Sequence, residues 1–224
     1  FIDLFIFYII IMFASQFSSS NVASSLMSRQ KVKHQMSSAI GRSQSAKRSP
    51  VVVCNADGQK SRIGLCGLAV MGQNLALNVA EKGFPISVYN RSADKTDGCV
   101  NSAEKEGLSS TLRGYKDLKE FVESIEKPRH IIILVKAGAP VDATIEGLSQ
   151  FLEPGDCIVD GGNEWYENTE RRMKEVQEKG LLYLGMGVSG GEEGARNGPS
   201  MMPGGSEEAY KRIEDILKPV SAQT

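Results

Sequence analysis

The feature that most constrains the fold is an apolar segment, residues 63–66 (Ile-Gly-Leu-Cys), followed at once by Gly-Leu-Ala-Val-Met-Gly at residues 67–72. A strand that turns into a helix within two residues leaves the first N–H groups of the helix unpaired, and they point at whatever anion lies above them. Gly67 permits the tight turn, and Gly72 lets the helix lie close to the sheet; Ala69 replaces the second glycine of the usual fingerprint and adds one methyl group. The pattern predicts a dinucleotide pyrophosphate site, formed by Gly67, Leu68, Ala69, Val70, Met71 and Gly72.

The residues after this turn follow the pattern of a strand-helix-strand unit. Met71, Leu75 and Val79 recur every four residues, as on one face of a helix, and Gly83 predicts the end of that helix. Residues 85–89 (Pro-Ile-Ser-Val-Tyr) then alternate like a strand. We therefore expect an α/β fold of the Rossmann type, with a doubly wound, mostly parallel sheet, over residues 61–224.

The end of the second strand carries the residues that distinguish the two nicotinamide cofactors. NAD-type proteins place an acidic residue there, about 20 residues after the glycines, to hold the ribose 2′-hydroxyl group. This chain has Asn90, Arg91 and Ser92 instead. A guanidinium and two short polar groups bind a 2′-phosphate through charge-assisted hydrogen bonds, whereas a carboxylate repels it. The sequence favours NADP over NAD; the alternative is an arginine that is simply solvated after a strand.

Three further strands are predicted, and small or polar residues follow each of them. Residues 94–127 read as one or two helices, and residues 130–135, 157–160 and 181–188 read as strands. Ligands of open α/β sheets bind at the carboxyl ends of the strands, where Lys136, Asn163 and Ser189 stand. Glycine pairs beside Asn163 and Ser189 let the backbone approach a ligand while the side chain orients it. A plain surface role is the alternative for Lys136.

Acid/base and metal chemistry find little support in the sequence. Glu192 and Glu193 are adjacent, so their side chains point differently, and we expect them to be solvated or structural. The four cysteines and two histidines have neither close pairing nor metal-ligand spacing, so we expect no disulfide framework and no metal. Cys66 and Cys157 fall in apolar strands, where a buried and inert thiol is expected.

Composition divides the chain into two unlike pieces. Residues 12–54 hold six Lys or Arg and twelve Ser but no Asp or Glu, whereas the remainder from residue 55 holds twenty basic and twenty-six acidic residues. A Ser-rich, acid-free segment with scattered arginines is typical of an organelle transit peptide, so we expect residues 12–55 to be disordered and to direct the protein to a plastid. A cytoplasmic location is the alternative, and a disordered nucleic-acid-binding tail is a second reading of the segment.

The first eleven residues are almost wholly apolar. They contain Asp3, have no basic residues before them and, even when extended to Ala14, are shorter than the about 20 residues that span a bilayer. We expect Met12 to be the true start and residues 1–11 to be leader sequence, with no membrane partner; a signal anchor is the alternative.

Five ordered motifs make the chain from residue 61 onward resemble the amino-terminal part of 6-phosphogluconate dehydrogenase in its plant-like form. The motifs are Gly-Leu-Ala-Val-Met-Gly-Gln-Asn-Leu (67–75), Asn-Arg-Ser (90–92), Val-Lys-Ala-Gly (135–138), Asp-Gly-Gly-Asn (160–163) and Gly-Val-Ser-Gly-Gly-Glu-Glu-Gly-Ala-Arg (187–196) with Met-Pro-Gly-Gly (202–205). Their order over about 160 residues makes a chance match implausible.

The resemblance implies a specific activity and assigns roles to residues. Enzymes of this family use NADP, without a metal, to oxidise and decarboxylate 6-phosphogluconate to ribulose 5-phosphate and CO2 in the oxidative pentose phosphate pathway. Carried onto this chain, residues 67–72 would hold the pyrophosphate with Met71 near the nicotinamide, and residues 90–92 would hold the 2′-phosphate. Val135, Lys136 and Ala137 would line the cofactor, Asn163 would touch both cofactor and substrate, and Ser189, Gly190 and Gly191 would bind the substrate.

The family's lysine base and glutamate acid lie in a long helical domain, and no residue of this chain matches them. We therefore expect no catalytic residue within these 224 residues, and expect the chain as given to bind NADP without turning over substrate alone. The full-length enzyme is expected to be a homodimer. Two alternatives stay open: another β-hydroxyacid dehydrogenase, against which Glu-Trp-Tyr (164–166) and residues 192–196 argue, and a non-catalytic NADP-binding module.

Overall fold

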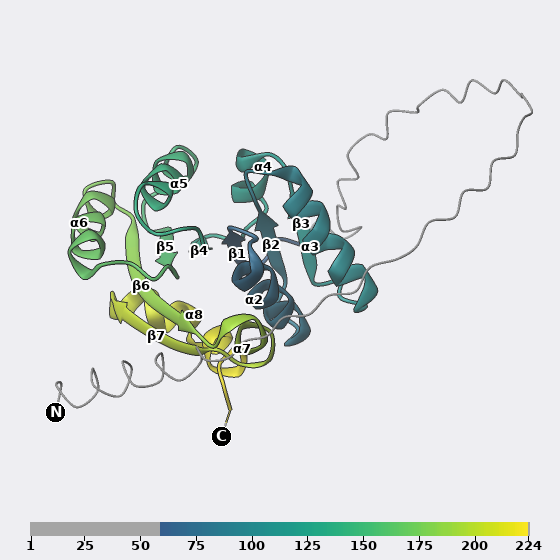
Figure 1. Cartoon of the computed structure of the whole chain (residues 1–224). Coiled ribbons are helices and arrows are strands. Elements are labelled where there is room, and N and C mark those ends of the chain that lie inside the picture. Colours follow the sequence, from purple (N-terminus) through teal and green to yellow (C-terminus); the bar gives the residue numbers. More distant parts are fainter. Residues whose placement is uncertain (1–58, 224) are drawn as a thin grey trace, which may run out of the picture. The chain divides into compact units, whose positions relative to one another are not determined.

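The computed structural model describes residues 59–223. The expectations for the apolar residues 1–11 and the transit-peptide-like residues 12–55 lie outside the described residues. Within residues 59–223, strands and helices alternate along the chain, as Figure 1 shows. Every helix within residues 59–223 is too short or too polar to span a bilayer.

The strands form a single sheet in the order β3-β2-β1-β4-β5-β6-β7. Six neighbouring strands run parallel, and β7 pairs with β6 in the antiparallel direction. The order of the first six is that of a doubly wound dinucleotide-binding sheet, so the predicted fold class is confirmed. The strands are β1 (Ile63–Cys66), β2 (Ile86–Tyr89), β3 (Leu112–Tyr115), β4 (His130–Ile133), β5 (Cys157–Asp160), β6 (Leu182–Ser189) and β7 (Ser200–Gly205).

Helices cover both faces of the sheet (Figure 1). Apolar side chains of α2, α3 and α8 pack in one cluster with one face, and those of α4, α5 and α6 pack in a second cluster with the other face. Successive residues of a parallel strand therefore enter different clusters: Ile132 belongs to the first, and Ile131 and Ile133 belong to the second. The helices are α2 (Val70–Glu81), α3 (Ala93–Lys105), α4 (Leu118–Glu123), α5 (Ala139–Ser149), α6 (Tyr166–Gln177), α7 (Gly191–Asn197) and α8 (Glu207–Val220).

Two strands of the structure were not predicted from the sequence, and a third is shorter than predicted. The segment 94–127, expected to hold only helices, contains β3 between α3 and α4. Its sequence Leu-Arg-Gly-Tyr lacks a continuous apolar run because it is an outer strand, with Arg113 buried and Gly114 facing α3. β7 was also not predicted, since Ser-Met-Met-Pro-Gly-Gly has low strand propensity and its proline is tolerated only at an edge. The predicted strand 130–135 ends two residues earlier, at Ile133.

Candidate functional site

The turn after β1 requires glycine at two positions. Gly67 has φ +105, and a Cβ there would lie 2.4 Å from the carbonyl oxygen of Leu134. A Cβ on Gly72 would lie 1.8 Å from the carbonyl oxygen of Gly67 and 3.3 Å from the Leu65 side chain in β1. The close approach predicted for Gly72 is thus made first to the turn itself and then to the sheet.

The N-terminus of α2 has free backbone donors. Its N-cap residue, Ala69, has no side chain that could accept from these N–H groups, and no acidic residue stands in the first turn. The first N–H group bonded back to the turn is that of Gln73, 3.0 Å from the Ala69 carbonyl. Val70 and Ala69 are exposed. This end of the helix therefore offers unpaired N–H groups and a positive dipole to an anion.

Asn90 links the end of β2 to the glycine turn. Its Oδ1 accepts the Leu68 N–H at 2.9 Å, and its Nδ2 donates to the Ser92 carbonyl at 3.2 Å. These bonds occupy the side chain, so Asn90 acts on the geometry of the turn in this structure. Arg91 and Ser92, the next two residues, are exposed, and no ion pair involves Arg91 among the residues that the structure describes.

A cleft of about 1180 Å³ lies at the carboxyl ends of the parallel strands. It brings together ten of the predicted site residues, which come from the ends of four strands and the start of α2. They are Gly67, Ala69, Val70, Met71, Asn90, Arg91, Ser92, Val135, Lys136 and Asn163. Sequence reasoning missed the other wall of the cleft, supplied by Leu118 and by Pro140, Ala143, Thr144 and Gly147 of α5. Small residues at a spacing of three to four on a helix were the available signal.

The remaining predicted site residues do not line this cleft. The Leu68 side chain is buried in the core, and its N–H donates to Asn90. Gly72 is buried against the Gly67 carbonyl. Ala137 follows Lys136 in the same loop and is half-buried outside the cleft. Ser189, Gly190 and Gly191 are exposed at the junction of β6 and α7, at the same edge of the sheet, where Val188 is the residue of β6 that reaches the cleft.

Helix α7 is held to the domain by contacts with α2 and with Glu106, away from the cleft. Glu192 and Glu193 are exposed and do not converge on the cleft. Arg196 donates to Glu81 of α2 and to Glu106, and buried Asn78 of α2 donates to the Ala195 carbonyl at 3.2 Å. Arg196, the last residue of the Glu-Glu-Gly-Ala-Arg motif, therefore serves to dock α7.

The loops after β4 and β5 are joined by a buried arginine that the sequence did not reveal. Arg172 of α6 is 1% exposed, and its guanidinium lies 2.7 Å from Asp142, 2.7 Å from Glu164, 3.5 Å from Asp160 and 3.1 Å from the Gly138 carbonyl. We call Arg172, Asp142, Asp160 and Glu164 the strand-end clamp. Its members belong to β5, α5, α6 and the loop after β5.

Glu164 is the most heavily bonded carboxylate of this clamp. It accepts hydrogen bonds from the Asn168 side chain at 3.0 Å, from the backbone N–H groups of Gly138 at 2.8 Å and Trp165 at 2.9 Å, and from Arg172. The Asn168 and Gly138 donors together with Arg172 lower the pKa of Glu164 to about 2. These donors therefore stabilise Glu164 as a carboxylate anion.

Asp160 extends the clamp to the glycine pair after β5. Its Oδ1 accepts the Gly162 N–H at 3.0 Å, and its Oδ2 accepts the Tyr183 hydroxyl at 2.6 Å. Burial, with the Asp160 charge beside the phenol, raises the pKa of Tyr183 well above its usual range. The hydroxyl is a fixed hydrogen-bond donor that orients Asp160, and through it the loop that carries Asn163.

The predicted burial of Cys66 and Cys157 is confirmed. Cys66 and Cys157 are buried, and burial raises the pKa of each thiol to about 12. Cys66 borders the cleft as an uncharged small residue. Among residues 59–223, no group of histidine, cysteine or acidic side chains could hold a metal ion.

A second hollow, of about 620 Å³, lies at the opposite end of the strands, where β1 and β4 begin. Its Lys and Arg residues are already paired: Arg62 with Asp215, Lys211 with Glu207, Arg212 with Glu208, and Lys218 with Glu214. Paired cations of this kind have little free charge for a ligand, so the cleft at the carboxyl edge is the candidate site.

The fold and this cleft define the class: a nicotinamide-dinucleotide-binding domain of the Rossmann type. Comparison with known proteins narrows the class. The chain belongs to the family described as the NAD-binding domain of 6-phosphogluconate dehydrogenase, whose model matches residues 62–224.

Curated relatives carry the same family name. The chain is 74% identical over 163 residues to 6-phosphogluconate dehydrogenase, decarboxylating 1, of Spinacia oleracea, and 68% identical over 163 residues to a chloroplastic form from Arabidopsis thaliana. The matched part is 73% of this chain in both cases. It is 34% of the first relative and 33% of the second, so the chain spans about a third of the relatives it matches.

Solved structures of related dehydrogenases share the fold of this chain. The Plasmodium falciparum 6-phosphogluconate dehydrogenase, solved with NADP+ and with 6-phosphogluconate, matches with a TM-score of 0.70 and 52% identity, covering 73% of this chain and 34% of that one. A Mycobacterium tuberculosis 3-hydroxyisobutyrate dehydrogenase matches with a TM-score of 0.62 but 19% identity, covering 73% of this chain and 53% of that one. The second likeness shows the shared fold alone and does not favour the alternative of another β-hydroxyacid dehydrogenase.

Proposed function

We propose that this chain is the NADP-binding part of a decarboxylating 6-phosphogluconate dehydrogenase. The observation that carries the cofactor proposal is the placement of exposed Arg91 and Ser92 on the same cleft as the uncapped N-terminus of α2. The pyrophosphate would take the free N–H groups of residues 70–72, and the ribose 2′-phosphate would take the Arg91 guanidinium and the Ser92 hydroxyl.

The loops after β4 and β5 would complete the cofactor site. Val135, Lys136 and Ala137 would flank the cofactor, and Asn163 would reach both the nicotinamide end and the sugar acid. Ser189, Gly190 and Gly191 would contact the substrate, 6-phosphogluconate, from the end of β6. When NADP is bound it accepts the hydride from the substrate, and the residues above bind and orient the two molecules.

The whole reaction, oxidation and decarboxylation to ribulose 5-phosphate and CO2 by a homodimer, is proposed for the complete protein. The relatives' names and the substrate complex of the Plasmodium enzyme support it. A non-catalytic NADP-binding module is the competing proposal. Sequence of the parent transcript beyond Thr224 separates them, because a lysine-bearing helical domain would support the enzyme and a stop codon would support the module.

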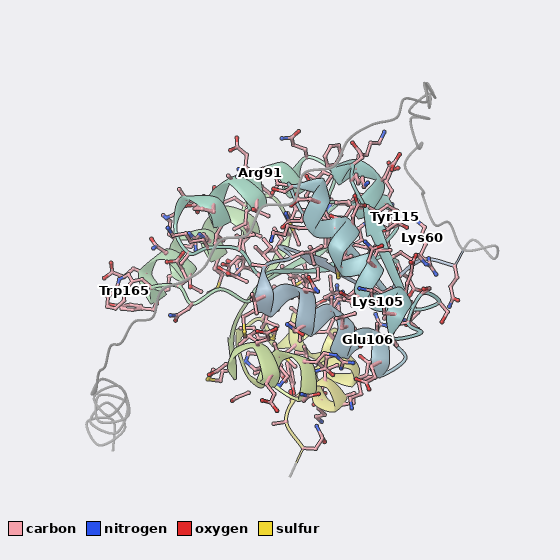
Figure 2. All side chains as sticks on the ribbon, turned by 45° about the vertical axis from the view of Figure 1, so that its right-hand side comes forward. Lys60, Arg91, Lys105, Glu106, Tyr115 and Trp165 are labelled. Atoms are coloured by element: carbon pink, nitrogen blue, oxygen red, sulfur yellow. The ribbon has the colours of Figure 1, made fainter. Side chains whose placement is uncertain are left out.

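Titration of the 224-residue chain with NADP and NAD tests the cofactor proposal. We expect NADP to bind at least about tenfold more tightly than NAD, as charge-assisted bonds to a phosphate predict, and Arg91→Glu to reverse this preference. Lys105→Glu is the matched control, since Lys105 is exposed at the far end of α3 (Figure 2) and should leave the preference unchanged. An Arg91→Glu chain that still prefers NADP would remove Arg91 from its role.

A plastid location is proposed on two grounds: residues 12–54 are rich in Ser and free of Asp and Glu, and several relatives are named chloroplastic. A fluorescent protein fused after residue 60 should enter plastids of leaf cells. Retention in the cytoplasm would contradict the proposal and favour the cytoplasmic alternative.

A further inference from the structure

The loop between β4 and α5 is hydrogen-bonded to the strand-end clamp at Gly138. Its N–H donates to Glu164 at 2.8 Å, and its carbonyl accepts from Arg172 at 3.1 Å. Gly138 has φ 90 and ψ −142, a backbone conformation that other residues rarely adopt. Both backbone groups of Gly138 are therefore hydrogen-bonded to members of the strand-end clamp, the N–H to Glu164 and the carbonyl to Arg172.

The residues on either side of Gly138 form part of the cleft. Val135 and Lys136 precede it, and Ala139 and Pro140 follow it, and all four line the wall. Glu164 directly follows Asn163, which lines the same cleft from the loop after β5. One carboxylate thus fixes the loop after β4 and the loop after β5 in a common arrangement.

Neither Glu164 nor Arg172 lines the cleft itself. The side chain of Arg172 is 1% exposed and that of Glu164 is 7% exposed, so both lie beneath the loops. A buried charge pair with four or more hydrogen bonds holds its partners in one geometry, because any other arrangement leaves a buried charge unpaired.

We propose that Glu164 and Arg172 are positioning residues for the cofactor: through Gly138 they hold the loop of Val135 and Lys136 at a fixed distance from Asn163. This inference rests on the proposed NADP-binding function. It assigns a role to Glu164, the first residue of the Glu-Trp-Tyr sequence after Asn163, which no predicted contact with cofactor or substrate had explained.

Two variants of the full 224-residue chain test the proposal. Glu164→Gln keeps the size of the side chain and removes its charge, and Arg172→Lys keeps the charge but loses the planar fork that reaches several partners at once. Arg171→Lys is the matched control, because Arg171 is the exposed neighbour on α6. It contacts Glu175 and, among the clamp residues, only Asp142 of α5, which makes no hydrogen bond to either loop in the part of the chain that the structure describes.

Two readouts are measured well below the melting temperature. Hydrogen exchange without ligand should become faster in segments 135–139 and 161–164 in both variants and stay unchanged in the control. NADP should bind about tenfold more weakly to both variants and unchanged to the control. A residue that only stabilised the fold would lower Tm and leave the affinity of the folded chain as it was.

The outcomes are separable. Unchanged exchange in these segments, or unchanged NADP affinity in a folded Glu164→Gln chain, overturns the proposal. If Glu164→Gln does not fold, Arg172→Lys decides by the same two measurements. A wild-type chain that fails to bind NADP overturns the proposed function, while the exchange measurement still decides whether the clamp holds the two loops together.

Discussion

Arg91 and Arg172 stand near the same edge of the sheet but in opposite circumstances. Arg91 is exposed on the cleft, and the part of the chain that the structure describes provides it with no ion pair. Arg172 is buried, and three carboxylates and a carbonyl take up its donors. The difference indicates two roles for arginine. Arg91 can offer its donors to a ligand, whereas each nitrogen of the Arg172 guanidinium already has a partner and so helps to fix the backbone around it.

The largest expected effect comes from removing the two charges in turn. Arg172→Met should lower the free energy of unfolding by about 3–5 kcal/mol, because it leaves Asp160 and Glu164 buried without a countercharge. Arg91→Met should change it by less than about 0.5 kcal/mol, as an exposed substitution usually does. Urea unfolding of both variants checks this pair, and similar losses in the two would break the comparison.

A second pair of variants tests the geometry of the glycine turn, which borders the same cleft as Arg91. Gly72→Ala should cost about 2–4 kcal/mol, because its Cβ would collide with the Gly67 carbonyl, which is backbone and cannot move aside. Gly98→Ala in α3 has open space around its Cβ and should stabilise the chain by about 0.5–1 kcal/mol through helix propensity. Equal effects in thermal unfolding would refute the steric account.

The last expected effect depends on pH and concerns His130, which is buried like Arg172 but has no hydrogen-bond partner for either ring nitrogen among the described residues. Burial, with Arg212 and Arg62 nearby, lowers its pKa from 6.5 to about 4, although the backbone of Pro128 and the Asp156 carboxylate oppose the shift. Between these values the unfolded chain binds a proton that the folded chain does not, so stability should fall as pH drops from 6.5 to 4.

The loss attributable to His130 should amount to about 3 kcal/mol across this window, because a shift of one pKa unit corresponds to about 1.4 kcal/mol. His130→Leu should flatten the stability profile across that pH window. Carboxylates titrate at the lower end of the window in both proteins, so the difference between the two profiles is the quantity to measure. Parallel profiles would mean that His130 does not titrate differently on folding.

The sequence predicted the half of the site that is built from local patterns. The glycine turn, the Asn-Arg-Ser segment and the strand ends at Lys136 and Asn163 are continuous in the chain, and their chemistry follows from residue type. The fold class was confirmed because the strands β1, β2, β4 and β5 are short apolar runs with little ambiguity.

The other half depends on contacts between distant residues. Arg172 sits in a helix of mixed charge, and nothing in the order Glu-Arg-Arg-Met distinguishes it from its exposed neighbour Arg171. Its partner Asp142 lies thirty residues away and becomes a partner only when α5 and α6 pack side by side. β3 and β7 were missed because strands at the sheet's outer positions need no apolar run.

The hydrogen bond from the Leu68 N–H to Asn90 has a practical consequence for redesign of cofactor preference. Asn90 secures the turn that is proposed to bind the pyrophosphate, and it directly precedes Arg91 and Ser92, which are proposed to select the cofactor. An exchange of residues 90–92 for an acidic NAD-type segment would therefore also release the turn, unless position 90 keeps an acceptor of similar reach. Switching the preference without losing affinity requires changes confined to Arg91 and Ser92.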